Sequence, residues 1–309
     1  MDPPVVLLTG PTASGKSALA LELAHRLEQT GGATIINADS MQVYQELRIL
    51  TARPSPDEEA AVPHRLYGIL PAVQPWSAAA FRADAHREIA AARSQGRIAL
   101  VVGGSGLYFR ALVDGLAPIP EISSSVRQEA RALMDQLGPE AFRSALAARD
   151  PESAESLGPG DRQRLIRAWE VVVGTGRSLA AWQRCPLVGG LDGPTVRAVV
   201  DVSRDTLYER IDARFVAMFD GGGLAEVEAL LARGLAPDLP ACRAVGVREM
   251  AEYLAGSMDR ARAIERGQQA TRRLAKRQMT WYRNQITNWP RISQDSESSV
   301  NGIFAKIRP

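Results

Sequence analysis

The eight residues Gly10-Pro11-Thr12-Ala13-Ser14-Gly15-Lys16-Ser17 constrain the fold of this chain more than any other segment. They match the pattern G-x-x-x-x-G-K-[ST], a loop whose backbone N–H groups surround phosphate oxygens. The pattern requires a strand before the loop and a helix after it. Residues 5–8 are an apolar run of strand length, and residues 18–27 carry leucines at helical spacing. We therefore expect a di- or triphosphate site, with Lys16 on the distal phosphate and Ser17 holding Mg²⁺.

Strands and helices alternate after this loop. Apolar runs at 33–37 and 98–102 predict two more buried strands, and Ser77 has the character of the N-cap of a helix that reaches about residue 94. Each strand ends in polar or glycine-rich residues, Asp39-Ser40 in one case and Gly103-Gly104-Ser105-Gly106 in the other. Strands separated by helices predict an α/β fold with a parallel sheet core flanked by helices, like that of the P-loop NTPases, whose ligands lie beyond the carboxyl ends of the strands.

The pattern changes near residue 118. Residues 123–182 are helical in pattern, with breaks at Gly138-Pro139 and Gly158-Pro159-Gly160, and the strand pattern returns once, at 196–202. This predicts an all-helical insertion domain inside the α/β core. The expected divisions are 1–118 for the first part of the core, 119–190 for the helical insertion, 191–290 for the second part of the core, and 291–309 for a loosely held C-terminal tail.

The charge is unevenly distributed although the net charge is only +2. Residues 259–291, most of which are predicted to form one long helix, contain nine Arg and Lys against two acids, which favours a polyanionic partner unless the helix simply presents a solvated face. No apolar run reaches the roughly 18–20 residues of a membrane span, and the first residues lack the pattern of a secretory signal. With two isolated cysteines, Cys185 and Cys242, the chain is expected to be a cytoplasmic protein with reduced thiols.

The position of the acidic residue near the predicted phosphate site helps to distinguish nucleotide hydrolysis from transfer of a group to an acceptor. Hydrolysis of a nucleotide requires an acid at the end of a neighbouring strand, and the third strand is followed by Gly103-Gly104-Ser105 instead. The available acid is Asp39, after the second strand. This placement favours a group that acts on an acceptor, although small-molecule kinases also carry an acid there.

The motifs along the chain resemble those of the tRNA dimethylallyltransferases (tRNA isopentenyltransferases), from about residue 5 to 289. Beyond the phosphate loop they are Asp39-Ser40-Met41-Gln42-Val43-Tyr44, Thr51-Ala52-Arg53-Pro54, Pro63-His64-Arg65-Leu66, Val102-Gly103-Gly104-Ser105-Gly106-Leu107-Tyr108, Asp161-Arg162-Gln163-Arg164 with Arg167-Ala168 and Glu170-Val171, Val245-Gly246-Val247-Arg248-Glu249, and Thr271-Arg272-Arg273-Leu274-Ala275-Lys276-Arg277-Gln278 with Trp281. Eight such motifs in order are highly specific.

The departures from the family pattern are few. Arg53 stands where the family usually has Lys, Leu50 where it has Gly, Ser105 where it has Thr, and Val247 where an aromatic residue is common. They leave open whether Arg53 and Val247 alter substrate contacts. The sequence lacks the zinc-finger extension of some eukaryotic relatives, which fits the bacterial type.

The resemblance implies transfer of a dimethylallyl group from dimethylallyl diphosphate to N6 of the adenosine 3′ of the anticodon, in an anticodon stem-loop of tRNA, by a monomeric enzyme that uses Mg²⁺. Asp39 and Ser105 are the catalytic candidates, with Asp39 as the base that takes the amine proton. The implied diphosphate ligands are Gly10, Pro11, Thr12, Ala13, Ser14, Gly15, Lys16, Ser17 and Arg214. The implied tRNA contacts are Asp39, Ser40, Met41, Gln42, Ser105, Arg127, Gln163, Arg164, Leu165, Ile166 and Arg167.

Two other functions compete with this hypothesis. One is a P-loop kinase of a nucleoside or small metabolite, whose insertion acts as a substrate lid. The other is a nucleotide-regulated RNA-binding module, against which the missing hydrolytic acid and the absence of switch motifs both argue. We expect Trp281 and Trp289 to pack in the core and not to stack on bases.

Overall fold

The computed structural model describes residues 3–293 and 297–307. The chain divides into two compact units, one made of Met1–Leu112 together with Asp192–Pro309 and the other of Val113–Leu191. We call the first the sheet unit and the second the helical insertion.

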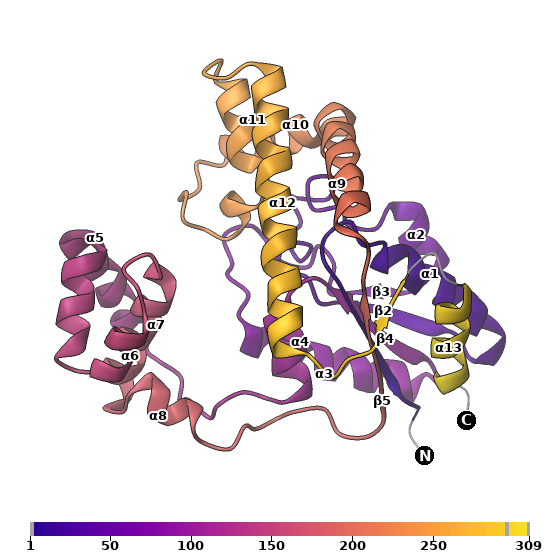
Figure 1. The fold of residues 1–309 in the computed structure, drawn as a ribbon, viewed down its shortest axis with the longest axis horizontal. Helices are drawn as coiled ribbons and strands as arrows, with labels where there is room; N and C mark the ends of the chain where they lie inside the picture. The colour runs from indigo at the N-terminus through magenta and orange to yellow at the C-terminus, as the bar shows by residue number, and fades with distance from the viewer. Residues whose placement is uncertain (1–2, 294–296, 308–309) are drawn as a thin grey trace. The chain divides into compact units, whose positions relative to one another are not determined.

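A parallel β-sheet forms the centre of the sheet unit (Figure 1). Among the described residues it has six strands in the order β3-β2-β4-β1-β5-β6. The strands are β1 (Val5–Thr9), β2 (Ala33–Asn37), β3 (His64–Arg65), β4 (Ile98–Gly103), β5 (Thr195–Val200) and β6 (Arg291–Ile292). The predicted α/β fold with a parallel sheet is confirmed. The two edge strands β3 and β6 were not predicted from the sequence.

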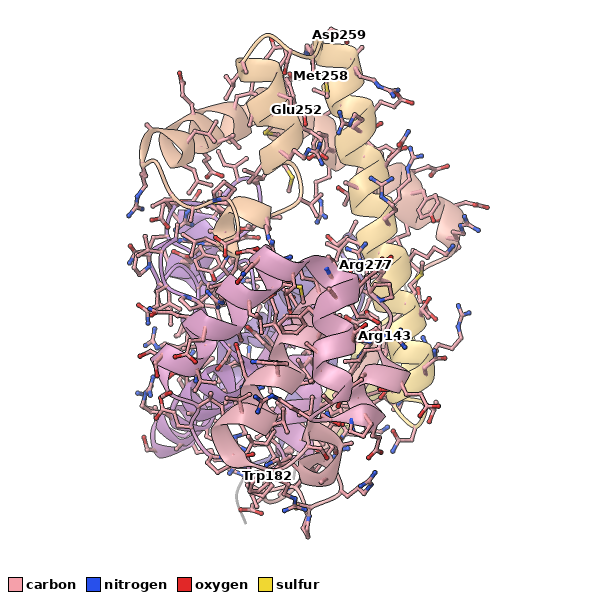
Figure 2. All side chains as sticks on the ribbon, turned by 90° about the vertical axis from the view of Figure 1, so that its left-hand side faces the viewer. Arg143, Trp182, Glu252, Met258, Asp259 and Arg277 are labelled. Carbon is pink, nitrogen blue, oxygen red and sulfur yellow. The ribbon has the colours of Figure 1, made fainter. Side chains whose placement is uncertain are left out.

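Helices surround the sheet and extend beyond it. In the sheet unit they are α1 (Lys16–Leu27), α2 (Pro56–Ala61), α3 (Ala78–Ser94), α4 (Gly106–Val113), α9 (Arg204–Met218), α10 (Leu224–Ala232), α11 (Val247–Leu254), α12 (Arg260–Gln285) and α13 (Glu297–Ile307). Ser77 caps α3 as predicted, because its side chain accepts a hydrogen bond from the N–H of Ala80. Asp259 caps α12 in the same way, and Figure 2 shows this residue at the start of the helix with Arg277 further along it. Helix α12 packs against α9 and α11.

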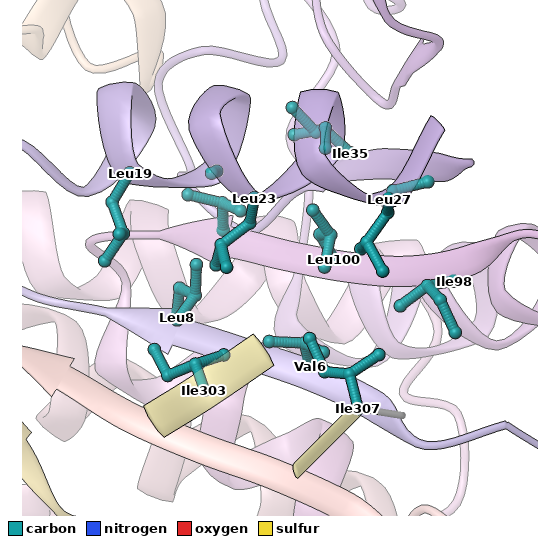
Figure 3. Packing of buried hydrophobic residues seen from close by; sticks show 14 of the residues in the cluster. Val6, Leu8, Leu19, Leu23, Leu27, Ile35, Ile98, Leu100, Ile303 and Ile307 are labelled. Atoms are coloured by element: carbon teal, nitrogen blue, oxygen red, sulfur yellow. The ribbon is translucent and has the colours of Figure 1, made fainter. Parts of the chain in front are cut away.

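One face of the sheet is covered by α1 and α13 (Figure 3). Alternate strand residues point to that face, and the parallel register aligns Val6 with Leu100 and Leu8 with Val102. Leu19, Leu23 and Leu27 come from one side of α1 at the spacing of successive helical turns and lie in the same buried cluster. This packing fixes the start of α1 at the end of β1, where the glycine loop lies.

The C-terminal segment differs from the loosely held tail that we expected. Residues 291–292 pair with β5 as strand β6, and Val300, Ile303 and Ile307 of α13 are buried in the cluster that covers the sheet. Their spacing of three and four residues puts them on one side of the helix, and burying each apolar side chain stabilises the fold by about 1.5–3 kcal/mol. The polar start of this segment had concealed that pattern. Its residues 294–296 and 308–309 lie outside the described residues.

The helical insertion has its own hydrophobic core. Its helices are α5 (Ser124–Ala147), α6 (Pro151–Ser156), α7 (Arg162–Thr175) and α8 (Leu179–Gln183). The α5 helix is interrupted at Gly138, whose φ is +73°, as the Gly-Pro pair predicted. Phe142, Leu146 and Leu165 are fully buried between these helices. The fold class predicted for the chain, a parallel sheet core with an all-helical insertion, is therefore confirmed.

Candidate active site

The glycine loop turns sharply between β1 and α1. The N–H of Ser14 donates to the carbonyl of Pro11 over 3.2 Å, which closes the turn. Gly15 has φ of +87°, a left-handed conformation that glycine adopts without the cost a side chain would bring. The first N–H groups of α1 have no partner within the helix, and they lie at the positive end of its dipole. The loop therefore has the local structure of an anion site.

Lys16 begins α1 and carries the charge of the loop. Its Nζ donates to the carbonyl of Pro11 over 3.2 Å. Desolvation lowers the pKa of Lys16 to about 8; the negative charge of Asp39 opposes this shift and the positive charge of Arg214 adds to it. Lys16, Asp39 and Arg214 thus share one electrostatic environment.

A cleft of about 420 Å³ opens beside the loop, within the size range of small-molecule sites. Its walls are Thr12, Ala13, Gly15, Lys16, Ser17, Asp39, Gln42, Thr51, Ala52, Arg210 and Arg214. Five of the eight loop residues, one acid and two arginines thus face the same space. The structure brings together the predicted phosphate loop, Asp39, Gln42 and Arg214. Thr51, Ala52 and Arg210 were not among the predicted site residues, although Thr51 and Ala52 belong to a motif that was noted.

Asp39 is held in place by its own loop. Its backbone N–H donates to the side chain of Asn37 over 2.8 Å, and its Oδ1 accepts from the N–H of Met41 over 2.9 Å. Asn37 in turn donates to the carbonyl oxygens of Asp39 and Leu66, each over 3.0 Å. These bonds fix the carboxylate while one oxygen, Oδ2, has no hydrogen-bond partner among the described residues. That oxygen is available to a ligand.

Ser105 lies next to this loop but does not line the cleft. Its Oγ accepts from the N–H of Ser40 over 3.0 Å and donates to the Ser40 hydroxyl over 3.3 Å. The serine therefore holds the loop after β2 against the turn after β4. Met41 and Ser40 are partly buried beside it and are also absent from the walls of the cleft.

Arg214 comes from α9, far from the loop in sequence. Its guanidinium donates to the hydroxyl of Thr12. Burial lowers the pKa of Arg214, and the negative charge of Asp39 opposes that shift, yet a guanidinium stays charged in any case. The residue therefore supplies a fixed positive charge at the loop.

Two residues of α12 also touch the site and were missed as site residues. Gln278 accepts from the N–H of Thr12 and donates to the carbonyl of Gly104, both over 2.9 Å. The hydroxyl of Tyr282, one helical turn later, lies 2.8 Å from the same Gly104 carbonyl and 3.1 Å from that of Gly10. The family motif contains Gln278, so the sequence held a signal, but nothing in it indicated these partners.

Four residues singled out in the sequence lie outside the walls of the cleft: the tryptophans expected in the core, Trp281 and Trp289, and two departures from the family pattern, Arg53 and Val247. Trp289 is buried against Phe109, as expected. Trp281 is half-buried, and its ring packs over Gly106. Arg53 donates to the carbonyl of Tyr44 over 3.1 Å, and Val247 is buried at the start of α11.

The predicted tRNA contacts of the helical insertion are divided between surface and core. Arg127, Gln163 and Arg164 are exposed, whereas Ile166 is half-buried. Arg167 is also half-buried and forms an ion pair of 3.2 Å with Glu170. Leu165 is fully buried in the core of the insertion. Its side chain is therefore unavailable to a ligand, which corrects the expectation for this residue.

Three of the exposed cations of helix α12, Arg273, Lys276 and Arg277, lie close together in its sequence (Figure 2 labels the last). Their spacing of three and four residues places them on one side of the helix. Other arginines of this helix are engaged in ion pairs: Arg272 with Asp212, and Arg266 with Glu252. The three exposed residues form a positively charged strip, which we call the α12 strip.

Within the described residues, no group of three or more His, Cys, Asp and Glu side chains is placed to hold a metal ion. Across residues 3–293 and 297–307, none of the helices has the length and apolar character needed to cross a bilayer.

Two family profiles match this chain. The profile of the IPP transferases matches residues 42–285, and that of the isopentenyl transferases matches residues 3–75. Because the first covers well over half of the 309 residues, the chain belongs to the IPP transferase family. This confirms the resemblance found in its motifs.

Similar proteins match over most of their length. The tRNA dimethylallyltransferase of Azorhizobium caulinodans is 52% identical over 96% of this chain and 94% of its own. That of Phenylobacterium zucineum is 50% identical over 100% and 99%. The solved tRNA isopentenylpyrophosphate transferase of Staphylococcus epidermidis has a TM-score of 0.67 and 30% identity, covering 99% and 98% of the two chains. A eukaryotic dimethylallyltransferase solved while acting on tRNA has a TM-score of 0.81 at 23% identity, over 99% and 80%, and shares the fold.

Proposed function

We propose that this protein transfers the dimethylallyl group of dimethylallyl diphosphate to N6 of the adenosine 3′ of the anticodon, position 37, in tRNA. The observation that carries the proposal is the lining of one cleft: five residues of the phosphate loop, two arginines and a fixed carboxylate. The relatives named above as tRNA dimethylallyltransferases and the family profile support the same reaction. The tRNA substrate places the reaction in the cytoplasm.

The loop side of the cleft binds the donor. In the reaction the C1–O bond of the allyl diphosphate breaks and the diphosphate leaves with developing negative charge. The loop N–H groups, the Lys16 ammonium and the Arg214 guanidinium stabilise that charge because they are fixed in place before the reaction. Removing one such donor in other enzymes costs about 10²–10³ in rate.

Mg²⁺ fits this side of the cleft. Ser17 contributes a hydroxyl to the wall, and Mg²⁺ in phosphate sites is held by few protein oxygens together with phosphate oxygens and water. Ser17 would hold the ion, which when bound would neutralise charge on the leaving diphosphate.

Asp39 works on the acceptor. Adenine N6 is a weak nucleophile because its lone pair is delocalised into the ring. As the N6–C1 bond forms, the Asp39 carboxylate accepts a hydrogen bond from the amine and takes its proton. Its bonds to Met41 and Asn37 orient the carboxylate, and Oδ2 remains for the amine. Ser105 acts on the same side by holding Ser40, and Gln42 lines the cleft next to Asp39.

The base must leave its stacked loop to reach Asp39, so the enzyme holds it in an extruded state. The exposed side chains Arg127, Gln163 and Arg164, together with Arg167, contact the RNA from the helical insertion. The α12 strip contributes positive charge toward the phosphates. A kinase is the less favoured alternative, because the family profile and the relatives that match almost the whole chain are those of isopentenyl and dimethylallyl transferases.

The experiment that tests this function is mass spectrometry of nucleosides. Unmodified anticodon stem-loops are incubated with the purified protein, Mg²⁺ and dimethylallyl diphosphate, then digested. We expect one adenosine to gain the mass of a dimethylallyl group in place of a proton, with release of one diphosphate. A parallel incubation with ATP and small acceptors tests the kinase. Unmodified RNA together with consumption of ATP would refute the proposed function.

A further inference from the structure

Gln278 connects two loops that belong to opposite sides of the reaction. Its side-chain oxygen accepts from the N–H of Thr12 in the phosphate loop, and its side-chain nitrogen donates to the carbonyl of Gly104 in the turn after β4. Both bonds are 2.9 Å long. A side-chain amide is well suited to this place, because it offers one acceptor and one donor at the same time. Gln278 itself is absent from the walls of the cleft.

The Gly104 end of this bridge lies beside Asp39. A Cβ added at Gly104 would lie 2.5 Å from Nε2 of Gln278 and 3.2 Å from Oδ2 of Asp39. The glycine thus lets the backbone, the amide and the carboxylate approach one another. The oxygen in question is the one that Met41 leaves without a partner.

The Thr12 end of the bridge lies in the phosphate loop, which is proposed to bind the allyl diphosphate. Gln278 engages the N–H of Thr12, and the hydroxyl of the same residue accepts from Arg214. Gln278 is therefore connected through Thr12 to Arg214, which acts on the leaving diphosphate, and through Gly104 to the turn beside Asp39, which acts on the attacking amine.

Tyr282 reinforces the bridge from the next turn of α12. Its buried hydroxyl lies within hydrogen-bond distance of the Gly10 and Gly104 carbonyls, so it also joins the end of β1 to the turn after β4. Burial raises the pKa of Tyr282, which keeps this hydroxyl protonated as a donor at neutral pH.

We propose that Gln278 is a positioning residue that sets the distance between the diphosphate loop and the Asp39 carboxylate. This role rests on the proposed function. Transfer requires C1 of the donor and N6 of the acceptor to meet in line, and each is held by a different loop. Without the Gln278 bridge, each loop keeps its own bonds and Tyr282 still joins the two strand ends, but the phosphate loop at Thr12 is no longer tied to the turn at Gly104. A displacement of about 1 Å in such a site costs on the order of a hundredfold in rate.

The test compares substitutions on α12 in the full chain. Gln278→Leu keeps the approximate volume and removes both hydrogen bonds. Gln278→Glu keeps an acceptor for Thr12 but loses the donor to Gly104, so it separates the two bonds. Gln285→Leu is the matched control, because Gln285 is exposed on the same helix and its side chain accepts a hydrogen bond from Arg110, outside the cleft. Thermal melting of each variant reports whether the fold is retained.

Two measurements distinguish positioning from binding. The first is the single-turnover rate of transfer to an anticodon stem-loop, and the second is the affinity for an unreactive phosphonate analogue of the allyl diphosphate without RNA. We expect Gln278→Leu to lose roughly a hundredfold in rate while analogue affinity changes by less than about threefold. Gln278→Glu should also lose rate, and Gln285→Leu should match the unaltered chain.

A Gln278→Leu rate within about threefold of the unaltered chain would overturn the role, as would analogue affinity that falls in proportion to the rate. A Gln278→Glu variant that folds and retains full rate would show that the Gly104 bond has no part in positioning. If the unaltered chain and Gln285→Leu both transfer the dimethylallyl group, the proposed function holds whatever the result for Gln278. If the unaltered chain transfers nothing, the proposed function fails and this role fails with it.

Discussion

The cleft of the sheet unit and the outer residues of the helical insertion hold their candidate side chains in opposite ways. Asp39 is fixed by hydrogen bonds at its backbone and carboxylate, and Lys16 is desolvated enough for its pKa to fall to about 8. Arg127 and Arg164 are exposed, and the ion pair of Arg164 with Asp161 spans 3.9 Å between two exposed side chains. Exposed pairs of this kind contribute little to stability. We therefore expect the cleft to act by holding its reactive groups in fixed positions. We expect the insertion to act through the positive charge that its exposed arginines present to RNA.

The largest effect is expected at Asp39, where this contrast is sharpest. Asp39→Ala should lower the single-turnover rate by at least about a hundredfold, the scale of a general base, with RNA affinity nearly retained. Asp39→Asn keeps an oxygen that accepts from the N–H of Met41 but cannot take a proton. If position and basicity both matter, Asp39→Asn should lose almost as much rate as Asp39→Ala.

Asp57→Ala is the matched control for Asp39. Asp57 is an exposed acid in the first turn of α2 and does not line the cleft. It should leave transfer unchanged. An Asp39→Asn enzyme with normal single-turnover kinetics would remove Asp39 from the role of base and leave it a purely structural one.

Binding of the allyl diphosphate should depend on pH through Lys16. The pKa of Lys16 is about 8 without a ligand, and a bound diphosphate raises it because the ammonium gains an anionic partner. Affinity for the unreactive donor analogue is therefore full below pH 8 and is lost as the pH rises above it, about tenfold per unit until the pKa of the complex is reached. The terminal phosphate titrates near pH 6, so it does not contribute above pH 7.5.

Lys16→Arg provides the control, since a guanidinium does not titrate in this range. Calorimetry between pH 7.5 and 9.5 should show a decline for the unaltered chain and a flat profile for Lys16→Arg. An equal decline in both proteins would assign the titration to another group.

The fold was predictable where the information is local. Residues 5–8, 33–37 and 98–102 are apolar runs of strand length, and each lies within an observed strand. Strands β3 and β6 have two residues each, too few to show any period, and they exist only through pairing with β2 and β5. Helix α13 was missed because a polar stretch precedes its apolar residues, and burial against α1 decides its structure.

The site was predictable to the same extent. The phosphate loop and Asp39 follow directly after strands, and a parallel sheet brings such segments to one edge. Gln278 lies 266 residues from Thr12, and its pairing with that residue follows from how α12 packs on the sheet unit. Leu165 shows the opposite case, a residue that a motif assigns to the site although the fold buries it. It directly follows exposed Gln163 and Arg164 in the same motif, but the helical period turns it into the core.

The smallest effect is expected for the arginines of the insertion, and it tests whether they act through charge alone. The double substitution Arg164→Gln and Arg167→Gln should weaken binding of an anticodon stem-loop several-fold. It should also reduce the slope of log affinity against log salt by about 2, roughly one for each lost phosphate contact. Arg87→Gln on α3, an exposed arginine of the sheet unit, is the control and should leave the slope unchanged.

The rate of transfer at saturating RNA separates the two regions. If the insertion only attracts and holds RNA, the double variant should reach the normal single-turnover rate once RNA is saturating, because charge loss outside the cleft does not move Asp39 or the diphosphate loop. A salt slope unchanged by the double substitution would mean that these arginines do not contact phosphates. A rate that stays low at saturation would mean that the insertion also positions the base, and the division between position and charge would then fail.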